Sequence, residues 1–461
     1  MAAATEYVKR ETSTAVIVLP QLLAEIFAAV EHAEIPYCLL RGYEELEGRG
    51  DLEIDVLVAS GSISRFAEVL RAQGFVRLPA WGHAPHHFFL NYDRALGRWL
   101  KFDAVTVLRY GRPVRALQID LAAECLRKRK RCGQVFVLAP EDEFFTLLLH
   151  GLLDKGHFRP ERSTRLRALR EQLRQSLAAY QTVEENFARY LRPALDWSAV
   201  VRACERNDLR VLLHKRKAAL RQLVQRQRFA FWRRTIFALL LRHLRPLLFA
   251  GHQPGLAVAL LAPDGAGKST LAAALQKDFG LRAQLVYMGT NVAAGTVGLP
   301  TTKWLQRRLK PKSGKPRLPK FLRLLLKPVN YLNRVCEQWY RCAFVVYQKR
   351  RGRFVVCDRY VYDSWIANPT TAGLKRWRRA WLEWGWPTPD LVILLDAPGE
   401  LLFARKGEHS VAWLEKQRAA YLALQPRLPQ MRVVAATQTA EEVKREVIAL
   451  IWKEYQSRYR L

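Results

Sequence analysis

The sequence has no C-x-x-C pair, although it contains seven cysteines. An odd number without close pairs speaks against a disulfide framework and a zinc site, and favours reduced thiols. No apolar run reaches the roughly 18 to 20 residues that a membrane-spanning helix needs. The first residues do not resemble a signal peptide either, because Gln21 and Glu25 interrupt the apolar stretch. We therefore expect a cytoplasmic protein.

Acidic residues are missing from two long stretches, between Asp208 and Asp264 and between Asp278 and Glu337. The chain has 75 Lys and Arg against 42 Asp and Glu, a formal net charge of +33. Such an excess predicts an anionic partner, and phosphorylated substrates, nucleic acid or an anionic membrane leaflet would all fit. Basic residues on solvated helix faces explain the charge equally well.

The chain of 461 residues is long enough for two or three domains, and we expect two. Short apolar runs separated by turn-rich segments predict an α+β domain over 1–139. Helical spacing of apolar residues predicts a helical extension over 140–250, followed by a linker at Gly251–Gly255. Over 251–461 strands alternate with helices, which predicts a parallel sheet covered on both faces, with a long basic insert at 301–351.

A glycine-rich loop follows the first apolar strand of this second part, Leu256–Leu261. Its two glycines let successive backbone N–H groups point at phosphate oxygens. Lys268 can reach the β- and γ-phosphates, and the Ser269 hydroxyl can bind Mg²⁺. The first glycine of the G-x-x-x-x-G-K-[ST] pattern is Ala262, from which we expect little effect. The sequence predicts that ATP and Mg²⁺ bind at Asp264, Gly265, Ala266, Gly267, Lys268, Ser269 and Thr270.

Two further apolar strands end in carboxylates. Phe354–Asp358 is followed by Arg359, and Leu391–Leu395 is followed by Asp396. In an open parallel sheet, ligands bind beyond the carboxyl ends of the strands. We therefore expect Asp358 close to the Mg²⁺ and Arg359 close to an acceptor phosphate or hydroxyl.

Together these motifs resemble those of the thymidylate kinase family, over roughly 256–461. The loop is similar to D-G-A-G-K-[ST]-T, and Asp358-Arg359-Tyr360 with Ser364 is similar to D-R-[YF]-x-x-x-S. Pro389–Asp396 with Arg405-Lys406 resembles the P-D-L-x-x-x-L-D strand and the lid helix. The resemblance implies a P-loop three-layer α/β/α kinase domain with a parallel sheet. It also implies phosphoryl transfer from ATP, with catalytic roles for Lys268, Asp358, Arg359 and Arg405 and magnesium ligands at Ser269 and Asp358.

The resemblance leaves the phosphate acceptor open. Thymidylate kinases carry R-E-P-G-G-T after the second strand, whereas this chain has V-Y-M-G-T-N at 286–291 and lacks the acceptor-binding arginine. The basic insert at 301–351 is also foreign to a compact nucleotide kinase. We expect a small-molecule acceptor, either a nucleoside monophosphate or a sugar-like or phosphorylated group, and favour the latter over dTMP.

The first part contains three carboxylates that could converge from adjacent strands. Glu53 and Asp55 are two apart in a predicted strand and so face one side, and Asp103 lies in another strand. This geometry suits shared Mg²⁺ ions, with all three as metal ligands. The pattern resembles the nucleotidyltransferase fold of DNA polymerase beta-like enzymes, although Arg41-Gly42 replaces the usual G-S or G-G. The fold with its chemistry lost is equally compatible.

A nucleotidyltransferase-like front joined to a thymidylate kinase-like back resembles bacterial proteins of surface-polysaccharide biosynthesis. The segments Phe229–Arg242 and Phe321–Lys327 mix basic and apolar residues. They suit helices that lie on an anionic membrane, such as the inner membrane face. They equally suit helices packed on the sheet or between domains, and we favour this second interpretation. Nucleic-acid binding is disfavoured, since no recognised module accompanies the charge. The alternatives to a kinase are a nucleotidyltransferase and a non-catalytic ATP-gated adaptor for membrane or nucleic acid.

Overall fold

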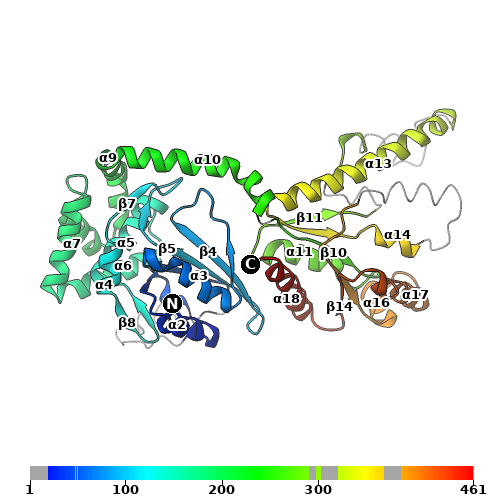
Figure 1. Cartoon of the computed structure of the whole chain (residues 1–461), viewed down its shortest axis with the longest axis horizontal. Coiled ribbons are helices and arrows are strands. Elements are labelled where there is room, and N and C mark those ends of the chain that lie inside the picture. Colours follow the sequence, from blue (N-terminus) through cyan, green and yellow to red (C-terminus); the bar gives the residue numbers. More distant parts are fainter. Residues whose placement is uncertain are drawn as a thin grey trace. The chain divides into compact units, whose positions relative to one another are not determined.

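The computed structural model describes residues 19–46, 48, 50–252, 254–289, 297–302, 320–367 and 386–459. The chain divides into two compact units, 1–245 and 246–459 (Figure 1). The division falls inside helix α10 (Arg228–His252), so the linker predicted at Gly251–Gly255 begins as helix. No helix among the described residues is both long enough and apolar enough to cross a membrane.

The first unit is built on a mixed seven-stranded sheet in the order β3-β4-β5-β2-β1-β9-β8. β1 is antiparallel to β2, and β2 is parallel to β5. The strands are β1 (Tyr37–Arg41), β2 (Leu52–Val58), β3 (Val76–Leu78), β4 (His86–Asp93), β5 (Arg98–Val105), β8 (Lys130–Cys132) and β9 (Val135–Val137), and β6 (Leu108–Tyr110) with β7 (Leu117–Ile119) forms a separate ribbon.

The two faces of this sheet are covered by different helices. α2 (Gln21–His32) and α3 (Ile63–Ala72) cover one face, where they pack on Ile54 of β2 and Phe102 of β5. Because side chains alternate along a strand, the next residues, Asp55 and Asp103, face the opposite side. The helical segment that follows the sheet in sequence covers that side.

This helical segment shares one hydrophobic core with the sheet. Phe145 packs edge-on against Phe187, which lies against Trp197. The last turns before Gly156 form a π-helical stretch, η3. The elements are α4 (Ala122–Lys128), α5 (Pro140–Leu149), η3 (His150–Lys155), α6 (Pro160–Arg174), α7 (Leu177–Tyr190), α8 (Trp197–Glu205), η4 (Leu209–Lys215) and α9 (Arg216–Arg226).

The second unit contains a five-stranded parallel sheet in the order β11-β12-β10-β13-β14. α13 (Lys320–Arg350) and α17 (Val411–Leu422) pack on one face, and α11 (Lys268–Asp278) and α18 (Ala440–Tyr459) on the other (Figure 1). This confirms the predicted three-layer α/β/α fold class. The remaining elements are β10 (Ala257–Leu261), β11 (Ala283–Tyr287), β12 (Phe354–Asp358), α14 (Tyr362–Ala367), β13 (Leu391–Asp396), α16 (Gly399–Lys406) and β14 (Met431–Ala435).

Candidate active site

The phosphate loop joins the central strand β10 to the start of α11. Gly265 and Gly267 adopt left-handed backbone angles, with φ of 91° and 81°. A Cβ atom on Gly265 would lie 2.6 Å from the carbonyl oxygen of Leu402 in α16. Glycine is therefore required at 265 both by the turn and by the close approach of the lid helix.

Ala262 fits the loop because its position does not need a glycine. The backbone of Ala262 does not have a positive φ. Its carbonyl oxygen accepts a hydrogen bond from Lys268 Nζ at 3.1 Å. Lys268 is only 8% exposed, and burial, helped by Arg359, lowers the pKa of its ammonium group. A buried ammonium held by one carbonyl is a ready partner for a phosphate.

Asp358 and Asp396 end the strands on either side of β10, but they are not equivalent. Leu260 of β10 pairs in register with Asp358, whose Oδ1 atom is buried without a hydrogen-bond partner. Both oxygens of Asp396 accept from Arg418, at 2.6 and 2.9 Å. Asp358 is thus the strand-end carboxylate with an oxygen to offer, and it fits the predicted role of a magnesium ligand.

Arg359 connects β12 to the phosphate loop. Its Nη2 donates to Asp264 Oδ1 at 3.0 Å and its Nη1 to Asp363 Oδ2 at 3.2 Å. The residue has φ of 66°, a strained conformation for a non-glycine residue that is common at functional sites. The hydroxyl of Tyr421 donates to the other oxygen of Asp363 at 2.9 Å. Sequence reasoning missed Asp363 and Tyr421, although Asp363 stands four residues after Arg359, the spacing of a helical ion pair.

Arg405 does not lie in this group. Its Nη1 donates to the carbonyl oxygen of Ala436, beyond the end of β14, at 2.9 Å. The loop after α16 instead brings His409 Nε2 to 4.0 Å from Asp264 Oδ2. Asp264, Glu408 and His409 offer ligand atoms that all lie within 4.8 Å of one another. The role expected of Arg405 at the transition state stays a prediction.

A buried ion pair lies beside the end of β11, next to the segment in which this chain lacks the acceptor-binding arginine of thymidylate kinases. Arg341 of α13 is fully buried, pairs with Glu337 at 2.9 Å and donates to the carbonyl oxygens of Tyr287 and Gly289. Glu337 also accepts from the Thr302 hydroxyl at 2.8 Å. The pair thus ties α13 to the end of β11. Thr290, Asn291, residues 303–319 of the basic insert and the side chains of Ser364 and 321–327 lie outside the described residues.

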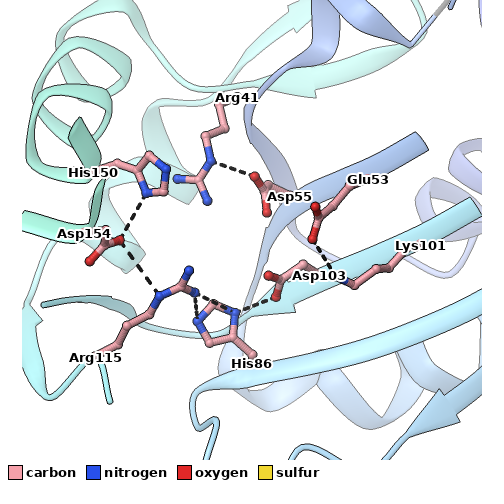
Figure 2. A network of polar contacts seen from close by, with 9 residues as sticks. All are labelled: Arg41, Glu53, Asp55, His86, Lys101, Asp103, Arg115, His150 and Asp154. Atoms are coloured by element: carbon pink, nitrogen blue, oxygen red, sulfur yellow. Dashed lines mark hydrogen bonds and ion pairs between the residues drawn. The ribbon is translucent and has the colours of Figure 1, made fainter. Parts of the chain in front are cut away.

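The three carboxylates of the first unit lie on β2 and β5, with Asp55 directly opposite Asp103. Figure 2 shows a basic partner beside each of them. The pairs are Arg41 Nε with Asp55 Oδ2 at 2.6 Å, His86 Nδ1 with Asp103 Oδ1 at 2.5 Å, and Lys101 Nζ with Glu53 Oε1 at 2.6 Å. Burial would raise the pKa of Asp55, but Arg41 outweighs it and the pKa is lowered. Each pair uses one oxygen of its carboxylate, and a metal ion would share the carboxylate charge with these partners. The role of the three carboxylates as metal ligands stays a prediction.

Comparisons with known proteins point to one family. The chain is 31% identical over 208 residues to the "Probable thymidylate kinase" of Thermococcus onnurineus, covering 41% of this chain and 94% of that protein. It is 31% identical to the "Thymidylate kinase" of Xanthomonas campestris pv. campestris (strain B100), covering 43% and 83%. With the "Probable thymidylate kinase" of Pyrococcus abyssi the identity is 34%, and the chain spans about half of that relative, 54%.

A solved thymidylate kinase from Candida albicans aligns over 44% of this chain and 94% of its own, with 22% identity and a TM-score of 0.31. No model of a known protein family matches the chain. The relatives with 31% identity are covered over most of their length, and the three motifs with which the resemblance began all lie in the second unit. The chain therefore belongs to the thymidylate kinase family.

Proposed function

We propose that the second unit is an ATP-dependent kinase that transfers a phosphoryl group to a small-molecule acceptor. One observation carries the proposal: at the carboxyl edge of the parallel sheet, the glycine loop with Lys268 adjoins the free oxygen of Asp358 and the guanidinium of Arg359. Positive donors and a carboxylate with a free oxygen are what a magnesium-bound polyphosphate requires.

Each group has a distinct task in this proposal. ATP with Mg²⁺, when bound, supplies the phosphoryl group and a divalent charge. The loop amides and the ammonium of Lys268 hold phosphate oxygens, and the helix start of α11 favours their negative charge. Ser269 and Asp358 would hold the metal. Arg359, fixed by Asp264 and Asp363, orients an anionic or hydroxyl group of the acceptor and stabilises charge that builds up during transfer.

The acceptor is a nucleoside monophosphate or another phosphorylated or sugar-like molecule. The thymidylate kinase relatives support a nucleotide. The missing R-E-P-G-G-T arginine, and the buried Arg341–Glu337 pair beside that position, support an acceptor other than dTMP. The resemblance of the two-part chain to proteins of surface-polysaccharide biosynthesis supports a role in that process. The test is to incubate the purified chain with γ-labelled ATP, Mg²⁺ and separate pools of nucleotides and sugar phosphates. Label should move to a member of one pool, and the kinase proposal fails if every pool stays unlabelled.

The nucleotidyltransferase alternative makes a different prediction. It requires pyrophosphate release from a nucleoside triphosphate that Asp55→Asn abolishes and Lys268→Ala preserves. Absence of pyrophosphate release in the unaltered chain, across all common triphosphates, would remove this alternative.

We also propose a peripheral contact with an anionic membrane, because α10 exposes a continuous apolar stripe. Six of its exposed apolar residues recur every three or four positions, and the first and last of the six are 80% and 73% exposed. Arg228 and Arg233 are exposed on the same helix, as anionic lipid requires. The stripe consists of Phe229, Trp232, Ile236, Leu240, Leu244 and Leu247.

Vesicle sedimentation tests the membrane proposal. The chain should sediment with vesicles that contain phosphatidylglycerol, less so at high salt, and not with pure phosphatidylcholine. The variant Trp232→Glu, in the middle of the stripe, should lose binding, whereas Trp339→Glu on α13 should keep it. Equal sedimentation with both kinds of vesicle, or none with either, would contradict the proposal.

A further inference from the structure

The polar residues around Arg41 in the first unit contain more cations than carboxylates. We call this set the Arg41 cluster: Arg41, Asp55, His86, Asp103, Arg115, His150, Asp154, Lys155 and Arg162. Figure 2 shows all but Lys155 and Arg162, together with the Glu53–Lys101 pair. The cluster has four permanently cationic side chains against three carboxylates. An excess of positive charge on a partly buried face favours an anionic ligand.

His150 has a buried nitrogen with nothing bound to it. The residue is 2% exposed, and its Nδ1 lies 3.1 Å from Asp154 Oδ2. Since a carboxylate only accepts, the proton sits on Nδ1, and the Nε2 atom has no hydrogen-bond partner in the described structure. Burial, together with Arg41, lowers the pKa of His150 to about 4, so the ring is neutral at pH 7. Its Nε2 lone pair therefore needs a donor such as a hydroxyl group.

Two cations of the cluster have no carboxylate of their own. Arg162 and Lys155 are partly buried, and neither side chain makes a hydrogen bond or ion pair with a described residue. Burial, followed by the nearby arginines, lowers the pKa of both groups. Arg115 Nε lies 3.9 Å from Asp154, and its Nη1 donates to the His86 ring, so its one carboxylate contact is a long one. All three can donate to a ligand without breaking a strong ion pair.

The backbone around these residues is unusual in two places. His150, Asp154 and Lys155 all lie on η3, the π-helical stretch that follows α5. Such stretches are rare and often occur at functional sites. Arg115 has φ of 48°, a strained conformation that brings its guanidinium beside His86.

We propose that the Arg41 cluster binds a small phosphate monoester without a metal ion. The phosphate lies among Arg115, Lys155 and Arg162, and a hydroxyl group of the same molecule donates to His150 Nε2. A hydroxylated phosphate such as a sugar phosphate provides both features. This site is distinct from the phosphate loop. It takes an anion where Glu53, Asp55 and Asp103 suggested a shared metal site, because those carboxylates already pair with Lys101, Arg41 and His86, and the neighbouring cations are left to bind a ligand.

The test follows the histidine Cε1 signals of the full chain, labelled with ¹³C-histidine and carrying Lys268→Ala to weaken the phosphate loop. Inorganic phosphate and glucose 1-phosphate are titrated in excess EDTA. The variants His86→Gln and His150→Gln identify which NMR signals belong to His86 and His150. Both signals should shift and saturate. Arg162→Gln should raise the ligand concentration at the midpoint of the titration about tenfold, which corresponds to the loss of one charged hydrogen bond. Arg174→Gln, an exposed arginine on the same helix, should leave it unchanged.

Three outcomes would overturn the proposal. The first is that neither signal moves with either probe. The second is that Arg174→Gln weakens binding as much as Arg162→Gln does, which would indicate general charge attraction. The third is that Mn²⁺ alone, without EDTA, broadens the His86 and His150 signals at stoichiometric amounts, which would restore a metal site at the carboxylates.

Discussion

The guanidinium of Arg359 lies 3.0 Å from the carboxylate of Asp264, although the two residues are 95 positions apart in the chain. Arg359 belongs to the motif that ends β12, and Asp264 belongs to the phosphate loop after β10. Adjacent parallel strands bring their carboxyl ends to the same edge, and this contact follows from the pairing of Leu260 with Asp358. The ion pair joins the two motifs into one site.

Replacing Arg359 by lysine keeps the charge but removes the fork that reaches Asp264 and Asp363 together. We expect kcat/KM for the labelled acceptor to fall by about 10- to 100-fold, the range for one lost charged hydrogen bond. The matched control is Arg353→Lys, at the opposite end of the same strand, where Arg353 contacts Gln348. Steady-state kinetics that fall equally in both variants would show that Arg359 acts only through folding.

Asp358→Asn should weaken the affinity for Mg²⁺, because the unpaired Oδ1 atom is the proposed metal ligand. We expect the Mg²⁺ concentration for half-maximal activity to rise by about tenfold or more. Asp396→Asn, at the end of β13, is the control, since both its oxygens are already bound by Arg418. An unchanged Mg²⁺ requirement in Asp358→Asn would remove the residue from the metal site.

The Arg341–Glu337 pair should stabilise the second unit strongly. Arg341→Met leaves the Glu337 carboxylate buried without its cation, which typically costs about 3–5 kcal/mol. Arg334→Met on the exposed side of the same helix should have little effect. Urea unfolding followed by tryptophan fluorescence measures the difference. Equal stability of the two variants would contradict the assigned burial of the pair.

Asp142 should make the first unit lose stability as the pH rises from about 4 to about 7. It is fully buried, neither oxygen has a nitrogen or oxygen donor within hydrogen-bond distance in the described structure, and burial raises the pKa of its carboxyl group to about 7. The folded state therefore keeps a proton that the unfolded state releases above its ordinary pKa near 4. Stability is highest below that ordinary value and falls as the pH rises to about 7.

The variant Asp142→Asn should remove this pH dependence. Between pH 5 and pH 8 we expect the free energy of unfolding of the unaltered chain to fall by roughly 2–4 kcal/mol more than that of Asp142→Asn. Glu161→Gln, an exposed carboxylate in the first turn of α6, should behave like the unaltered chain. Identical pH profiles for all three would show that Asp142 is ionised in the folded state.

Sequence reasoning predicted the parts of the second unit that depend on local patterns. Strand, glycine loop and helix follow from residues within a few positions of each other, so the fold class and the place of Lys268 could be predicted. The direction of Arg405 could not, since it depends on where the end of β14 lies. The contact of Asp363 with Tyr421 of α17, and those of Arg341 with Tyr287 and Gly289 at the end of β11, likewise join segments distant in sequence.

The first unit shows a different limit. The spacing of Glu53 and Asp55 gave their strand, and the pairing of β2 with β5 places Asp103 beside them. What the spacing could not predict is the charge of the helical segments that cover this face of the sheet. His150 and Arg162 lie near Asp55 although they belong to helical segments more than ninety residues later in the chain, and they change a set of acids into a basic cluster.

The most direct test of the central claim is calorimetric titration of Mg²⁺–ATP into the full chain and into Lys268→Ala. We expect one strong site in the unaltered chain and a loss of affinity of at least about tenfold in the variant, with unchanged circular dichroism. Equal affinity in the two proteins would contradict the assignment of the glycine loop as the site that holds ATP.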